Sequence, residues 1–146
     1  MTPLVQPVID RLRDRMPVLE GRVAGAAQLA TLMAGRAGPH QTPAAHVLPT
    51  GGSFGAAETI AGFYRQAHTR TIGVLLWVGT YEATGARAVP QIEDLIGQVI
   101  TALAGWSPPD VGGDFRVRRS GLVDLRAALI AWQIDFDIND QLRITT

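Results

Sequence analysis

The segment from residue 128 to residue 138 constrains the fold more than any other part of the chain, because its apolar residues recur at every second position. A period of two places alternate side chains on opposite faces of a β-strand. One face of this segment is apolar throughout, and the other becomes polar toward Asp135 and Asp137. This pattern is typical of an antiparallel strand with one face on the core and one in water. The chain therefore builds part of its core on a sheet.

A longer strand is predicted at residues 63–79, where alternation starts at Ile72 and both faces become apolar toward the end. A strand that is apolar on both faces is covered on both sides, so we expect this one to be central in the sheet. Shorter strands are predicted at residues 18–23, 44–48 and 115–119, the second of them ended by Pro49 and the third by a turn at Gly121.

Helices are predicted where apolar residues recur every three or four positions. The strongest signal covers residues 89–104, and a shorter helix is expected at residues 25–34. An N-terminal helix is expected at residues 4–16, capped by Thr2 and ended by Pro17. The predicted fold is α+β, with a mostly antiparallel sheet of four to five strands and two main helices packed on one face. At this length we expect one domain spanning residues 1–146.

Two polar or glycine-rich stretches are predicted to be exposed loops, at residues 50–62 and 80–88. Long loops in compact domains often carry function, and loops can become ordered when a partner binds. The predicted interface residues in these loops are Gly52, Ser53, Phe54, Tyr81 and Glu82.

Composition excludes several classes of function. The 13 basic residues, all Arg, balance 13 acidic residues, which disfavours a strongly basic nucleic-acid binder. The chain has no Cys, so disulfides and thiol chemistry are excluded. The longest apolar run, residues 72–79, is far shorter than the roughly 18 residues of a membrane-spanning helix, so no membrane contact is predicted. We expect no secretory leader at the start of the chain.

No residue pattern supports catalysis or cofactor binding. Residues 51–55 fit the G-x-S-x-G pattern of hydrolases, but only Glu58 lies between Ser53 and His68, so an acid and a base cannot follow on separate strands. The three histidines, which include His40 and His46, lack the spacing of zinc ligands. We therefore predict no catalytic, cofactor-binding or metal-binding residues.

Two charged groups are further interface candidates. Arg116, Arg118 and Arg119 form the densest basic cluster, and Asp135 and Asp137 share one strand face. In an isolated subunit both groups are interpreted as solvated faces, and a divalent-ion site at the aspartates is a weaker alternative. In a ring of subunits, the arginines would pair with the aspartates of a neighbour or line a channel for DNA.

The order of several short motifs resembles the tail terminator proteins of long-tailed phages, Mu-like phages and gene transfer agents. The motifs are P-A-A-H-V at residues 43–47, the strand at residues 70–78, A-G-W-S-P at residues 104–108 and the closing segments 120–125 and 132–136. The resemblance spans nearly the whole chain, and each motif taken alone is weakly specific.

The resemblance implies a structural virion protein with no catalytic residues. It implies a homo-oligomeric ring, commonly a hexamer, that sits on the last ring of tail tube protein, stops tube polymerisation and offers a docking surface to the head–tail connector or neck protein. DNA would pass through only as cargo. The implied location is the head-proximal end of the virion tail, after assembly in the host cytoplasm.

Three alternatives stay open at this point. The first is a head-completion or neck protein of the same particle, which differs in position and not in chemistry. The second is a small enzyme that uses Ser53 or the aspartate face. The third is a ligand-binding domain with its pocket under the glycine-rich segment.

Overall fold

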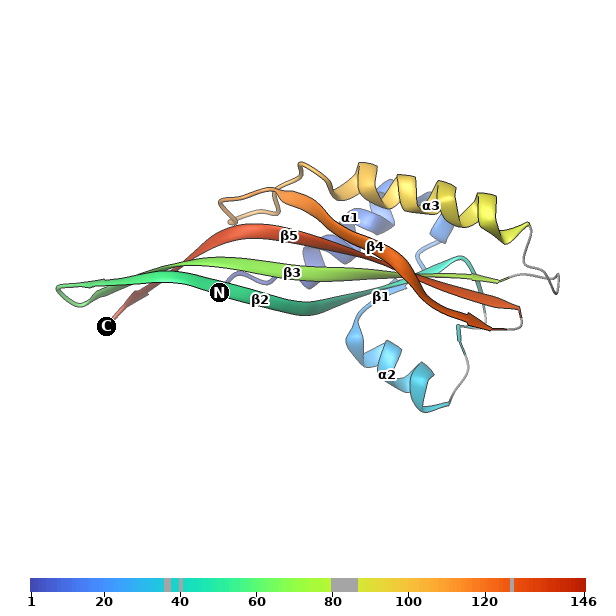
Figure 1. Ribbon diagram of the computed structural model, residues 1–146, viewed down its shortest axis with the longest axis horizontal. Coiled ribbons are helices and arrows are strands. Elements are labelled where there is room, and N and C mark those ends of the chain that lie inside the picture. The colour runs from blue at the N-terminus through green and yellow to red at the C-terminus, as the bar shows by residue number, and fades with distance from the viewer. Residues whose placement is uncertain (36–37, 40, 80–86, 127) are drawn as a thin grey trace.

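The computed structural model describes residues 1–35, 38–39, 41–79, 87–126 and 128–146 as helices around one five-stranded sheet (Figure 1). The strand order is β1-β2-β3-β5-β4. The strands are β1 (Val23–Ala24), β2 (Ala44–Ile60), β3 (Phe63–Gly79), β4 (Phe115–Arg126) and β5 (Leu129–Thr145). The α+β class is confirmed. The sheet is mixed, because β1 pairs in parallel with β2 while the other pairs are antiparallel.

Three α-helices accompany the sheet. They are α1 (Val5–Arg15), α2 (Ala26–Ala34) and α3 (Ala88–Leu103), and a short 3-10 turn, η1 (Pro17–Leu19), follows α1. The main core joins α1 and α3 to one face of the sheet, with Leu12, Val99 and Leu76 fully buried in it. None of the helices among the described residues is long and apolar enough to cross a membrane.

A smaller cluster lies on the opposite face of the sheet, where Leu29 of α2 packs against Leu75 and Trp77. The indole Nε1 of Trp77 donates a hydrogen bond of 2.9 Å to Nδ1 of His46. Because that nitrogen accepts, the ring proton lies on Nε2, which donates to Oε1 of Gln28 at 2.9 Å. Burial lowers the pKa of His46. This chain of hydrogen bonds joins α2 to the sheet through a neutral histidine.

The central strand is confirmed over its full predicted range, but the predicted loop at residues 50–62 is wrong. Strand β2 passes through Pro49 and continues to Ile60, and it pairs with β3 along this length. Ala61 and Gly62 both have positive φ, 46° and 81°, as a two-residue hairpin turn of type I′ requires. The glycines of this segment therefore lie in a strand that tolerates them because its side chains are exposed on both faces.

Other strand boundaries also differ from the prediction. Strand β4 continues through Gly121 to Arg126, and β5 continues past residues 139–140 to Thr145, because each keeps pairing with its neighbour. The predicted strand at residues 18–23 is wrong for most of its length. Residues 18 and 19 belong to the turn η1, which places Leu19 in the core, and β1 begins only at Val23.

The predicted helices at residues 89–104 and 25–34 are confirmed as α3 and α2. The N-terminal helix is confirmed too, but its predicted cap is wrong. Leu4 occupies the cap position, and the hydroxyl of Thr2 lies 3.5 Å from the carbonyl oxygen of Asp110.

Candidate assembly interface

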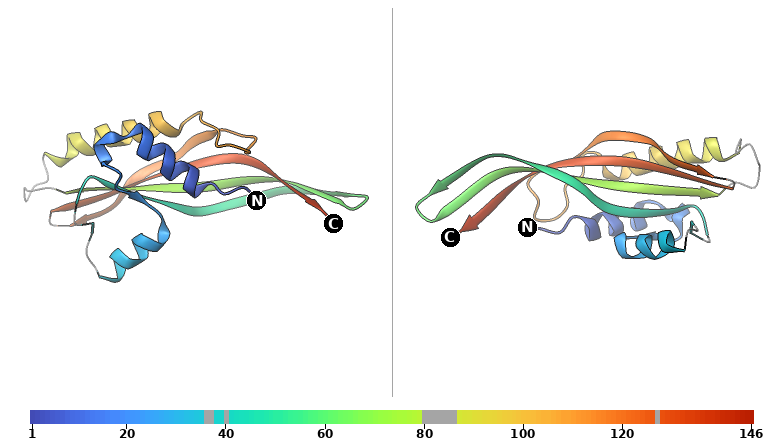
Figure 2. Two further views of the ribbon diagram at one scale, coloured as in Figure 1. Left: turned by 180° about the vertical axis from the view of Figure 1, so that it is seen from behind. Right: turned by 60° about the horizontal axis from the view of Figure 1, so that its bottom comes forward.

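The β2–β3 hairpin and the end of β5 project beyond the helices as a three-stranded extension, which we call the arm: residues 50–67 and 141–145 (Figures 1 and 2). Every residue from 50 to 63 is exposed, although all of them belong to a strand or its turn. The arm therefore lacks a core of its own and is held toward its tip by strand pairing and by exposed side-chain contacts such as the ion pair between Arg65 and Glu58. A strand ribbon without a buried face is only marginally stable in water.

The tip of the arm carries large apolar side chains in solvent. Ile60 is 69% exposed, and Phe63 and Ile144 are also exposed. Register places Ile60 opposite Phe63, and Tyr64 opposite Ile144, so both faces of the tip have apolar groups. Clustered apolar side chains in solvent mark an interaction surface, whereas single ones do not.

The base of the arm is fastened to the N-terminal segment. A guanidinium nitrogen of Arg70 donates to the carbonyl oxygen of Thr2 at 2.6 Å and lies 3.9 Å from the carboxylate of Asp140. The ring of Phe54 stacks on His68 with centroids 4.0 Å apart. Burial lowers the pKa of His68, the charge of Arg70 lowers it further, and Asp140 opposes both effects. The arm therefore has a fixed base and an uncovered tip.

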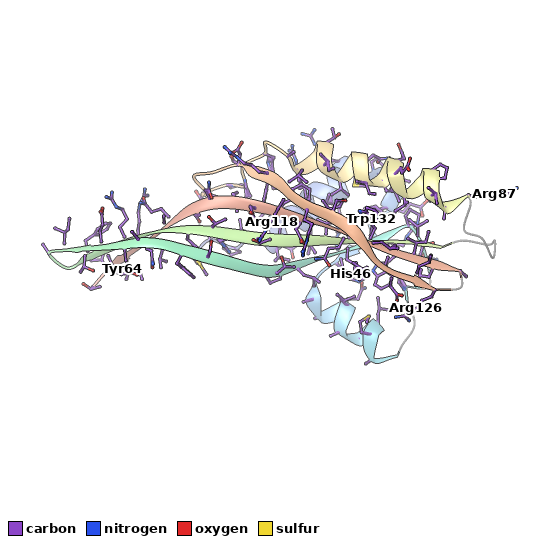
Figure 3. All side chains as sticks on the ribbon, viewed as in Figure 1. His46, Tyr64, Arg87, Arg118, Arg126 and Trp132 are labelled. Carbon is purple, nitrogen blue, oxygen red and sulfur yellow. The ribbon has the colours of Figure 1, made fainter. Side chains whose placement is uncertain are left out.

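A second apolar surface lies on the edge strand β4. Leu122, Val123 and Leu125, which we call the β4 patch, are each more than half exposed. Figure 3 shows Arg126, the last residue of β4, at the end of the molecule opposite Tyr64 in the arm. The two apolar surfaces are thus separated by the length of the sheet.

The predicted arginine and aspartate groups meet within one chain. The guanidinium of Arg119 lies 3.2 Å from the carboxylate of Asp135, and that of Arg118 lies 3.7 Å from Asp137. Asp135 is only 5% exposed, and its other oxygen accepts from Gln133 at 2.8 Å. These arginines therefore already have acidic partners inside the subunit and do not need a neighbour's aspartates.

Arg116 lies apart from these pairs. A register shift between Val117 and Arg119 interrupts the alternation of β4, and the Nε atom of Arg116 is 4.0 Å from a carboxylate oxygen of Asp114. The basic cluster seen in the sequence is thus divided among three acidic partners.

The other predicted site residues fall in two places. Gly52, Ser53 and Phe54 lie within the arm, while Tyr81 and Glu82 lie outside the described residues, as does His40. Ser53 is in a strand, not in the strand–turn–helix bend that a nucleophile elbow requires. Among the described residues, no group of three or more potential ligands could hold a metal ion.

Sequence reasoning missed the apolar residues of the arm tip and the β4 patch. The signal for the tip was present, because Ile60 and Phe63 flank the dipeptide Ala61-Gly62, and apolar residues around a short glycine-containing turn indicate a hairpin. The β4 patch gave a weaker signal, because Gly121 directly precedes Leu122 and resembles a strand end.

The chain is similar to known proteins in both sequence and fold. A sequence profile of the family described as "Phage tail terminator protein" matches residues 2–146. A chain of the structure titled "Virion of native gene transfer agent (GTA) particle" has a similar fold, with a TM-score of 0.50, 16% sequence identity and coverage of 95% of each chain. No curated protein matches the sequence.

Proposed function

Because the chain belongs to the phage tail terminator family, and is thus a structural protein of a phage-type tail, we propose that it closes the head-proximal end of the tail tube as a ring. Each subunit is a single domain. The ring, a hexamer as in the family resemblance, stops addition of tail tube protein and presents a docking surface to the head–tail connector.

The observation that carries the proposal is the arm. A chain that acts alone has no use for a strand ribbon whose apolar tip is in water, because uncovered apolar surface promotes nonspecific association. A subunit of a ring or tube cap can bury this surface against a neighbour. The arm residues Gly52, Ser53 and Phe54 are therefore proposed to lie in or beside an assembly contact.

The charge distribution supports DNA as cargo and not as a bound partner. The net charge is zero, and Arg118 and Arg119 are each placed beside an aspartate. Lasting DNA contact needs cations that are free to replace the counterions of the phosphates, and paired arginines do this poorly. A passage with balanced charges lets DNA move through.

The test is to delete the gene from its producing element and to image the tails by negative stain. Overlong tubes without heads are the expected result, because nothing then stops tube growth. Tubes of normal length that fail to join heads would move the protein to the neck of the particle. Intact particles would refute a structural role. Supplying the wild-type chain in trans is the control and should restore tail length.

A further inference from the structure

The exposed apolar side chains of this protein are concentrated at its two ends. Within the described part of the chain, 12 large apolar side chains are exposed, and seven of them lie in the arm or in the β4 patch. The arm and the last residues of β4 are at opposite ends of the sheet (Figures 1 and 3). A surface at each end requires either two different partners or one contact that joins both ends.

The two ends also offer opposite edges of the same sheet. Strand β4 is the last strand in the order on one side. On the other side β1 pairs only with Ala45 and His46, so from Val47 to Ile60 the outer edge of β2 has no strand partner among the described residues. Unpaired strand edges favour addition of another chain. A head-to-tail contact between copies brings these two edges together.

We propose that the arm of one copy docks on the β4 patch of the next copy, so that a single kind of contact covers both apolar surfaces. This rests on the proposed function, because it specifies the contact by which the ring closes. In a head-to-tail contact every copy gives one arm and receives one, and a closed ring leaves neither uncovered. A two-fold pair could also place each arm on the β4 patch of the other copy, but that arrangement ends at a dimer, so a double variant that gives linked dimers and nothing larger would overturn the ring contact.

Charge does not oppose this contact. The arm holds Glu58 beside Arg65, with 2.6 Å between carboxylate and guanidinium. The β4 patch holds Asp124 beside Arg126. Each apolar surface is thus flanked by its own ion pair, and apolar burial is not resisted by repulsion between like charges.

Cysteine cross-linking tests the contact, because the natural chain has no Cys to interfere. Ile60 and Leu125 are exposed, so Ile60→Cys and Leu125→Cys leave the fold intact. A short bismaleimide is added to the double variant, both as purified protein and in tails isolated from the producing element. The expected product is a ladder of linked chains that stops at the copy number of the ring. The single variants give no ladder.

A matched control pairs Ile60→Cys with Met33→Cys, since Met33 is exposed on α2 and belongs to neither surface. This control should give no ladder. Linked dimers from Ile60→Cys alone would indicate a two-fold contact and overturn the proposal. Tails that contain the double variant but no linked chains would also overturn the proposed contact. The arm would then be available to the tube protein, and the proposed function would stand. A ladder from purified protein, together with tails that do not contain the chain at all, would support the contact and refute the proposed function.

Discussion

The two halves of β3 differ in what surrounds them. From Ile72 to Val78 every residue is buried, between the α1–α3 layer on one side and the cluster around Trp77 on the other. From Phe63 to Ala67 the same strand is exposed or half-buried, although it stays paired with β5 throughout and with β2 except at the register shift between Phe54 and Ala57.

Backbone hydrogen bonding and burial of apolar side chains usually stabilise the same part of a strand, but the outer half of β3 has the first without the second. Strand pairing satisfies the backbone in both halves, but only the inner half removes apolar surface from water. Burial of a Leu or Ile side chain stabilises a fold by about 1.5–3 kcal/mol, whereas the net contribution of one hydrogen bond is about 1 kcal/mol. The inner half therefore holds the subunit together, and the arm adds little to its stability.

The largest effect on stability is expected from a cavity in the inner half. Leu76 is fully buried, so Leu76→Ala should lower the free energy of unfolding by about 2–5 kcal/mol, measured by urea denaturation. The control deletes the same atoms at an exposed position. Leu122, in the β4 patch, is 54% exposed, and Leu122→Ala should change the free energy of unfolding by no more than about 0.5 kcal/mol. Equal losses would show that β4 is part of the core.

A smaller effect is expected where the loop before β4 approaches β5. A Cβ atom on Gly113 would lie 2.2 Å from the backbone oxygen of Asn139, whereas one on Gly112 would have nothing within 4 Å. Gly113→Ala should therefore cost about 1–3 kcal/mol, because backbone must move, and Gly112→Ala should cost far less. Thermal unfolding of the two variants measures the difference. A harmless Gly113→Ala would mean that this loop is free to move away from β5.

Acid should weaken the inner half before it affects strand pairing. Because burial lowers the pKa of His46 below its ordinary 6.5, the unfolded chain binds the proton more readily than the folded one. Stability from the neutral ring is fully present above pH 6.5 and is lost as the pH falls below it. Protonation would also remove the acceptor of the Trp77 hydrogen bond. Trp fluorescence during urea unfolding at a series of pH values measures this, and His46→Gln should reduce the slope below pH 6.5.

The inner half could be predicted from the sequence because buried positions require apolar residues, which then recur at a regular spacing. Alternation at Ile72 and beyond, and the apolar repeat of α3, identified the central strand and the long helix. The arm could not be predicted in the same way. With both faces in water, nothing selects apolar residues at alternate positions, and the glycines at 51, 52 and 55 then resemble a loop.

The contacts of the predicted interface residues could not be predicted from the sequence either. Arg118, Arg119, Asp135 and Asp137 were recognised as charged groups, but only the register of β4 against β5 shows that they pair with one another. Which residues pair across two strands depends on the position of any bulge. The bulge in β4 lies between Val117 and Arg119, and no residue type in this segment indicates its position.

The smallest effect on stability is expected from shortening the arm. Residues 57–66 can be removed as register pairs, since Ala57 faces Gln66, and a two-residue Asn-Gly turn can replace them. Residues 142–146, which pair with this part of β3 and its turn, are removed as well. These residues are exposed or half-buried, so the free energy of unfolding should change by no more than about 1 kcal/mol. Assembly should nevertheless be lost, because the apolar tip is gone, and tails made with this variant should be overlong.

A gentler variant, Ile60→Asp, changes a single exposed side chain at the tip and should give the same result. The control is Val18→Asp, because Val18 is apolar and 42% exposed but lies outside both surfaces, and it should leave tails normal. If shortening the arm lowered stability as much as Leu76→Ala, the two halves of β3 would form one cooperative unit, and the arm would belong to the core. If stability and tail length were both unchanged, the exposed tip would have no partner, and the contact that closes the ring would lie elsewhere on the molecule. Only folded subunits that no longer assemble would show that one strand serves the fold with its inner half and the particle with its outer half.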